Sequence, residues 1–307
     1  MNWQGIIATP FGYIMEGLYT LTSNYGIALI LFAALVQAVI VPINRKNQRD
    51  REKKQLLQPQ IAQIRKEYEN DIDKQTDLIA ALYDQEKISL AGGFILRILP
   101  IIILIGIFQV VAQPITYIFH ETPETAAVIV NAIRKEAPEL FDSGYNQVTA
   151  LAHIQDYTHI VKEIVPEVST KTLQGLNNSF LGLDLSTVPG VHLLGKGEWI
   201  WDWAHIGAIM LPIVYMARRF YMVFGGMIRS LIYYSKKKKE AIANNQQIPA
   251  LPKPPLMDLI FLFLSLTAMF AVPIAMDLYW LTSGVAASSY RKLNNKFSPK
   301  KAETIKV

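Results

Sequence analysis

Residues 25–43 have the sequence YGIALILFAALVQAVIVPI, which contains no ionised side chain. Asn44, Arg45 and Lys46 follow directly and end the apolar stretch. Because a helix crosses the hydrocarbon core of a bilayer in about 20 residues, a stretch of this length and composition is typical of a membrane-spanning helix. We therefore expect a transmembrane helix over residues 23–44.

The composition of the whole chain agrees with a membrane protein. Of its 307 residues, 51% are hydrophobic and 18% are charged, and the mean hydropathy is +0.22, which is more apolar than a typical soluble domain. Cysteine is absent, so disulfides, thiolate nucleophiles and cysteine metal sites are excluded. The five histidines have no metal-ligand spacing and no glycine-rich phosphate loop is present, so we expect no metal, cofactor or catalytic centre. Residues 1–20 lack the basic start and the cleavage site of a signal peptide.

Four further segments have the apolar composition of membrane-spanning helices. The last two of them form one continuous apolar stretch from Leu256 to about Gly284. This stretch is longer than one membrane-spanning helix, and we expect the chain to fold back at Pro273. The predicted fold class is an all-α membrane protein with five transmembrane helices. Besides residues 23–44, the predicted spans are residues 92–118, 200–221, 256–274 and 275–290.

The basic residues predict the orientation of the chain. Lys and Arg are concentrated in residues 45–91, 222–255 and 291–307. Because the positive-inside rule places such segments in the cytoplasm, we expect the C-terminus inside, the N-terminus outside and residues 119–199 as an extracytoplasmic loop. The net charge of +5 follows from these segments and does not by itself indicate a nucleic-acid partner.

The segments outside the spans differ in kind. Between residues 51 and 90 apolar residues recur three or four positions apart, which predicts an antiparallel helical hairpin in the cytoplasm with its turn at Asn70-Asp71. Residues 236–255 contain four prolines and predict a flexible connector, and residues 291–307 form a basic tail. Residues 1–22 predict an amphipathic helix in the outer interface of the bilayer, because one side of it carries Ile6, Phe11, Ile14, Met15 and Leu18.

Several short motifs occur in a fixed order along nearly the whole chain. They are Asn24-Tyr25-Gly26 and Pro42-Ile43 around the first span, the arm Gln55–Tyr68, Leu82-Tyr83 followed by Ala91-Gly92-Gly93, Ser179–Ser186, and Pro273–Ser283 with its Tyr279-Trp280 pair. Together they resemble the insertase family of bacterial YidC, mitochondrial Oxa and chloroplast Albino proteins. The resemblance says little about the long loop over residues 119–199.

The resemblance implies a membrane protein insertase in the bacterial plasma membrane. Such a protein guides hydrophobic segments of client proteins into the bilayer through a polar groove open to cytoplasm and lipid, and it breaks no covalent bond. The implied partners are nascent membrane proteins, membrane lipids, the ribosome and the translocation channel, with no small-molecule substrate. Two other functions stay open. One is a specialised assembly or scaffold factor on the same fold, and the other is a small-molecule transporter, against which the lack of an inverted repeat counts.

Polar residues inside the spans are the candidates for lining the groove, because polar groups in hydrocarbon are costly. The family's bacterial members carry an arginine midway along the first span, where this chain has Gln37, and an asparagine where it has Gly284. Aligning Leu211-Pro212 with the family's third span places Arg218 and Arg219 within the membrane, where one of them supplies the missing charge; alternatively, both mark the cytoplasmic end of that span. The groove candidates are Gln37, Arg97, Gln109, Arg218, Arg219 and Asp277.

Several candidates also have a purely structural interpretation. In that interpretation Gln37 makes an interhelical hydrogen bond, and Arg97 extends its head group to the cytoplasmic interface. Asp277 either pairs with an arginine or faces the water outside, and Asp258 suits the N-terminus of the fourth span. Aromatic residues near span ends predict interface anchors at Trp201, Trp203, Tyr279 and Trp280.

Overall fold

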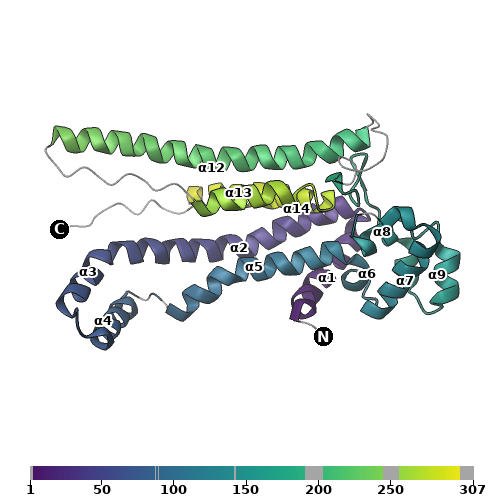
Figure 1. Cartoon of the computed structure of the whole chain (residues 1–307), viewed down its shortest axis with the longest axis horizontal. Coiled ribbons are helices and arrows are strands. Elements are labelled where there is room, and N and C mark those ends of the chain that lie inside the picture. The colour runs from purple at the N-terminus through teal and green to yellow at the C-terminus, as the bar shows by residue number, and fades with distance from the viewer. Residues whose placement is uncertain are drawn as a thin grey trace.

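The computed structural model describes residues 3–86, 88, 90–141, 143–190, 203–244 and 256–297, and the chain is mostly helical in them (Figure 1). Along the long axis lie α2 (Tyr25–Leu56), α5 (Leu90–Ala112), α12 (Trp203–Ala243), α13 (Leu256–Ala268) and α14 (Ile274–Phe297). One end of the molecule carries α3 (Gln58–Glu67) and α4 (Ile72–Gln85). Towards the other end lie α1 (Trp3–Thr22), α6 (Pro114–Tyr117), α7 (Pro123–Glu136), the 3₁₀ helix η1 (Pro138–Phe141), α8 (Asn146–His153), α9 (Thr158–Ile164), α10 (Thr170–Gln174) and the antiparallel pair β1 (Ser179–Phe180) and β2 (Leu183–Asp184).

Two helices in the described part of the chain are long and apolar enough to cross a membrane. They are residues Tyr25–Lys46 of α2 and Ile206–Ala243 of α12. Residues Ile101–Ala112 of α5 form a shorter apolar stretch. Length and composition, together with the helical content, agree with the predicted all-α membrane protein.

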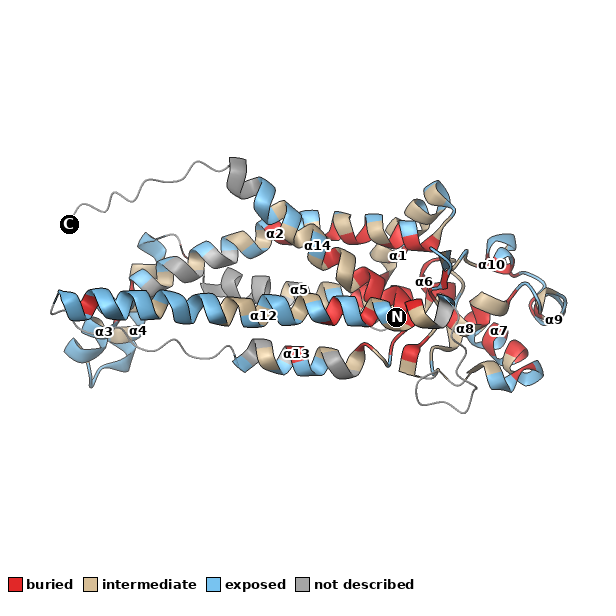
Figure 2. Cartoon of the chain, turned by 90° about the horizontal axis from the view of Figure 1, so that it is seen from above, coloured by how far each residue is buried: buried red, intermediate tan, exposed pale blue. Residues whose placement is uncertain are grey.

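Helices α2 and α14 pack along each other and form the centre of the bundle. Phe32 of α2 is fully buried, and its ring centroid lies 6.3 Å from that of Tyr279 on α14. The turn between α13 and α14 contains Pro273, and the N–H of Ile274 donates to the carbonyl oxygen of Thr187 at 2.9 Å. Figure 2 shows the buried residues gathered at the end of the bundle nearest α6 and α8, whereas α12 is largely exposed or half-buried.

Three helices extend past the C-terminal ends expected for their spans, and one of them is α14, which continues past residue 290 into the expected basic tail as far as Phe297. Helix α2 continues past residue 44 to Leu56, and α12 continues past residue 221 to Ala243. Residues 236–243, expected in a flexible connector, are therefore helical instead. Lysine, alanine and glutamate are good helix formers, and adding residues to an existing helix is far easier than starting one. The proline-rich residues 245–255 lie outside the described part of the chain.

Residues 119–199, expected as an extracytoplasmic loop, are largely folded. Helices α7, α8, α9 and α10 enclose their own core, in which Ile129, Ile133, Leu151 and Ile154 are buried almost completely. The hydroxyl oxygen of Thr122 caps α7 by accepting a hydrogen bond from the N–H of Thr125 at 3.1 Å. We call residues 123–174, with this core, the helical unit. Residues 191–202 lie outside the described part of the chain.

Helix α1 packs against α5 and α2. Of the residues predicted on its apolar side, Met15 is fully buried and Phe11, Ile14 and Leu18 pack against the same core, whereas Ile6 is 58% exposed. The helix is thus part of the bundle along most of its length.

Helices α3 and α4 pack against each other at the opposite end of the molecule from the helical unit (Figure 1). Leu57 and Ile61 are buried there against Leu82 and Tyr83 of α4. The carboxylate of Asp71 caps α4 by accepting a hydrogen bond from the N–H of Lys74 at 3.0 Å. The turn was expected at Asn70-Asp71, and it lies over residues 68–70, directly before this cap.

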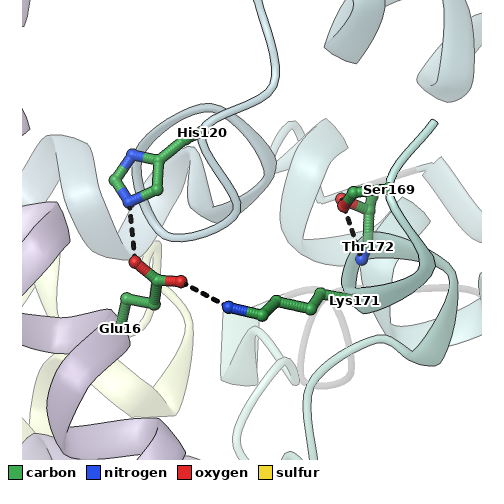
Figure 3. Close-up of polar contacts among 5 residues, drawn as sticks. All are labelled: Glu16, His120, Ser169, Lys171 and Thr172. Atoms are coloured by element: carbon green, nitrogen blue, oxygen red, sulfur yellow. Dashed lines mark hydrogen bonds and ion pairs between the residues drawn. The ribbon is translucent and has the colours of Figure 1, made fainter. Parts of the chain in front are cut away.

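Glu16 joins α1 to the helical unit, as Figure 3 shows. One carboxylate oxygen of Glu16 accepts a hydrogen bond from Nζ of Lys171 at 2.9 Å, and the other lies 3.1 Å from Nε2 of His120. The ring of His120 stacks on Tyr13, with 4.0 Å between the centroids. The hydrogen bond from Lys171, with a smaller contribution from His120, holds the pKa of the Glu16 carboxyl below its ordinary value of 4.5, although partial burial opposes this.

This lowered pKa predicts how acid affects the junction. A carboxylate whose pKa is depressed by folding stabilises the folded state above its unfolded pKa, and this stabilisation is lost as the pH falls through the folded pKa. We expect Glu16→Gln to lower the melting temperature at pH 7, and this difference from the wild type to shrink as the pH is brought below 4.5 and to vanish once the pH is below the lowered pKa of the folded state. Glu163→Gln removes an exposed carboxylate of α9 instead and serves as the control. A melting-temperature difference for Glu16→Gln that is unchanged by acid would contradict this account of the junction.

Candidate functional site

Polar side chains of three helices meet inside the bundle. Gln37 of α2 donates from Nε2 to the hydroxyl oxygen of Ser283 on α14 at 2.6 Å. One turn further along α14, the hydroxyl of Ser288 donates to the carbonyl oxygen of Gly284 at 2.9 Å. Helix α14 therefore presents hydroxyl and carbonyl oxygens at successive turns.

Arg218 of α12 reaches this row of polar groups. Its guanidinium donates to the carbonyl oxygen of Gly284 and to the hydroxyl oxygen of Ser288, the latter at 2.9 Å. A Cβ atom on Gly284 would lie only 2.0 Å from a guanidinium nitrogen of Arg218. Glycine at this position thus leaves the space that the guanidinium occupies. We call Gln37, Arg218, Ser283, Gly284 and Ser288 the polar cluster.

The partners of Arg218 are all neutral. None of the ion pairs found among the described residues includes Arg218, so its positive charge is not cancelled by a carboxylate there. A guanidinium carries five N–H donors, and those of Arg218 bond to one carbonyl and one hydroxyl. The polar cluster therefore offers a fixed positive charge, with amide and hydroxyl groups beside it, to an incoming acidic group.

Asp277 lies two turns before Gly284 on α14 and does not join the polar cluster. Its side chain is fully buried, and neither carboxylate oxygen has a hydrogen-bond partner in the part of the chain that the structure describes. Asp277 therefore neither pairs with Arg218 nor faces water in this structure.

The other groove candidates are separate from the polar cluster. Gln109 of α5 accepts a hydrogen bond at Oε1 from Nε2 of Gln113 at 2.7 Å. The buried Nε of Arg219 has no hydrogen-bond partner among the described residues. Arg97 lies in α5 and Asp258 in α13, and the placement of both side chains falls outside what the structure describes.

The expected interface anchors occupy different surroundings. Trp203 is 59% exposed, and its indole N–H donates to the carbonyl oxygen of Leu181 at 2.8 Å. Trp280 packs on Tyr215, with 5.7 Å between the ring centroids. Tyr279 is buried against α2 rather than placed at an interface, because it faces the core between α2 and α14. Trp201 lies outside the described residues.

Ser288 and the room left by Gly284 were not predicted as parts of a site. The available signal was the spacing of residues 284 and 288, which lie one turn apart on the same face of a helix.

Among the described residues there is no group of three or more His, Cys, Asp or Glu side chains that would hold a metal ion.

Comparison with known proteins points to one family. The family model described as 60Kd inner membrane protein matches residues 17–301. The chain is similar to proteins named membrane protein insertase YidC: it is 30% identical over 115 residues to that of Nitratidesulfovibrio vulgaris strain DP4 (38% of this chain, 22% of the relative). It is 30% identical over 108 residues to that of Geobacter sp. strain M21 (35% and 20%) and 31% identical over 110 residues to that of Granulibacter bethesdensis (36% and 19%). The matched part thus spans about a fifth of the length of these relatives. No solved structure matches the chain.

Proposed function

The chain belongs to the family of the 60Kd inner membrane protein, and we propose that it is an insertase that guides hydrophobic segments of client proteins into the bilayer. The observation that carries the proposal is the guanidinium of Arg218, held inside the bundle by neutral oxygens of α14. Neutral acceptors leave the positive charge available to an acidic group of a client. Similar proteins are named membrane protein insertase, which supports the same function.

The proposed topology has five spans, α2, α5, α12, α13 and α14, in a bacterial plasma membrane. The basic ends of α2 and α12 and the pair α3–α4 lie at one end of the molecule, and the helical unit lies towards the other (Figure 1). The positive-inside rule assigns the basic end to the cytoplasm. In this topology α3 and α4 form a cytoplasmic hairpin, α1 lies in the outer interface, the N-terminus is outside and the C-terminus is inside.

The polar cluster lowers the free-energy cost of moving the polar flank of a client across hydrocarbon. An ionised residue at the bilayer centre costs about 2.5–3.5 kcal/mol on insertion scales. Arg218 attracts an acidic residue of the client, and charge attraction is stronger in the bilayer than in water. Gln37 and Ser283 offer hydrogen bonds in place of those to water, while the apolar segment of the client enters the lipid.

The proposed partners are nascent membrane proteins and membrane lipids. Lys236–Lys239, at the basic end of α12, suit anionic lipid head groups or ribosomal RNA, because both present phosphates. The translocation channel is a further proposed partner.

A specialised assembly factor is the second candidate function. The observation that favours it is the helical unit, which has its own core and is joined to α1 through Glu16. Such a factor would use this unit to hold one dedicated partner and would not insert general clients.

Rescue of a bacterium depleted of its own insertase separates the two functions. We expect this chain to restore growth and to insert a single-span client with an acidic N-terminal tail, measured by protease protection of that tail in inside-out membrane vesicles, where an inserted tail lies in the lumen. A matched strain with the empty vector is the control. Normal expression of the chain without rescue would contradict the insertase and favour the assembly factor.

A further inference from the structure

A cleft of about 810 Å³ opens between the C-terminal half of α1, the helical unit and the β1–β2 pair. It adjoins the start of α2, because the side-chain amide of Asn24 donates to the carbonyl oxygen of Ser179 at 2.8 Å beside it. Glu16 and Lys171, the pair shown in Figure 3, form part of its wall. The size lies within the range of ligand-binding sites in proteins, about 300–1,000 Å³.

The charged groups that line the cleft are already engaged. Glu16 is neutralised by Lys171, and the carboxylate of Asp184 accepts hydrogen bonds from the N–H and the hydroxyl of Ser186. A strongly charged ligand would have to displace the pair of Glu16 and Lys171, and an anion would also meet the negative charge of Asp184. The lining favours an uncharged ligand.

Polar side chains without partners also line the cleft. The side chains of Thr20, Ser23, Gln174 and Asn178 make no hydrogen bond to any other part of the described chain, and the hydroxyl of Tyr19 accepts from the N–H of Asn177 while its own proton stays available. An amide side chain both donates and accepts, as a peptide group does, so Gln174 and Asn178 match the backbone of an extended peptide. Phe119, Leu151 and Leu176 add apolar lining that suits small apolar side chains of such a peptide.

We propose that this cleft binds an extended, uncharged polar segment of polypeptide, namely the part of a client that has crossed the membrane. The proposal rests on the proposed insertase function and its topology, which place the cleft on the outer side. The cleft lies at the end of α2 where the helix begins, and the same helix carries Gln37 of the polar cluster. A client segment that leaves the bundle along α2 arrives at the cleft. Binding there opposes its return and gives the insertion a direction.

Disulfide cross-linking tests the cleft directly, because the natural chain has no cysteine. One variant is Gln174→Cys, in the lining of the cleft, and the matched control is Glu163→Cys, an exposed position of α9 outside it. Each full-length variant is combined in membranes with a single-span client that carries one cysteine in a translocated segment of Ser, Thr, Asn and Gly. We expect about tenfold more cross-linked product at residue 174, because bound segments have a high effective concentration.

Two measurements distinguish failure of the cleft proposal from failure of the proposed insertase function. Equal cross-linking at residues 174 and 163, with the client inserted normally, would overturn the cleft and leave the insertase function intact. If no client is inserted, a synthetic peptide with the sequence of the translocated segment is added to the purified variants instead. Preferential cross-linking of this peptide to Gln174→Cys would support the cleft without the insertase function, and equal cross-linking to both variants would overturn it.

Discussion

Arg218→Gln is expected to reduce insertion of a single-span client with an acidic N-terminal tail about tenfold. The attraction between the guanidinium and the acidic tail that is lost is about 1.4 kcal/mol, roughly half the cost of one ionised residue in the bilayer. This free energy corresponds to a factor of ten. The substitution keeps a hydrogen-bonding amide near Gly284 and Ser288 and removes only the charge. The measurement is the fraction of client whose tail is cleaved by protease added to the outer side of spheroplasts, because an inserted tail is exposed there and a tail that has not crossed is protected. The helical bundle should remain folded, which the melting temperature of the purified variant reports.

Two neighbouring substitutions provide the controls for Arg218→Gln. Arg219→Gln removes the same charge from the next residue of α12, for which no hydrogen bond to α14 is seen among the described residues, and it should leave insertion close to the wild type. Gln37→Ala removes one interhelical hydrogen bond of about 0.6 kcal/mol and should lower insertion about threefold or less. A larger loss with Arg219→Gln than with Arg218→Gln would contradict the assignment of the charge to Arg218.

Gly12→Ala is expected to destabilise the protein by about 1–3 kcal/mol, the usual cost of forcing extra volume into a packed contact. A Cβ atom at residue 12 of α1 would lie 2.0 Å from the carbonyl oxygen of Tyr117 in α6. Because this oxygen belongs to the backbone, no rotation of a side chain relieves the clash, and α1 or α6 must move. The melting temperature of the purified protein in detergent measures the effect.

Gly17→Ala is the matched control on the same helix. A Cβ atom there meets no atom within 4 Å, and alanine favours a helix over glycine by about 1 kcal/mol. The melting temperature of Gly17→Ala should therefore equal or exceed that of the wild type. Equal losses of stability in the two variants would show that α1 and α6 do not approach each other as closely as described.

The apolar pattern predicted the core of the fold well because burial and membrane crossing depend on composition. The stretch over residues 25–43 forms α2, and the apolar stretch after Leu256 folds back at Pro273. The resemblance to the insertase family is confirmed by the family model that matches residues 17–301. In these respects local sequence carries the information.

The remaining features depend on contacts between distant residues. The helical unit was not predicted, because its short α-helices of five to fourteen residues bury their apolar sides against one another and against α6, which are contacts between separate segments of the chain. The choice between Arg218 and Arg219 depends on which side of α12 meets α14, and adjacent residues of a helix point about 100° apart. Gly284 matters only because a guanidinium from another helix fills the space beside it.

The most direct test of the insertase function uses the purified chain in liposomes without any other protein. A single-span client with an acidic N-terminal tail is synthesised in their presence, and protease is then added from outside. We predict that the tail is protected in liposomes that contain the wild-type chain, with protection clearly reduced for Arg218→Gln and near background in empty liposomes. Equal protection in empty liposomes and in liposomes with the wild-type chain would contradict the proposed function.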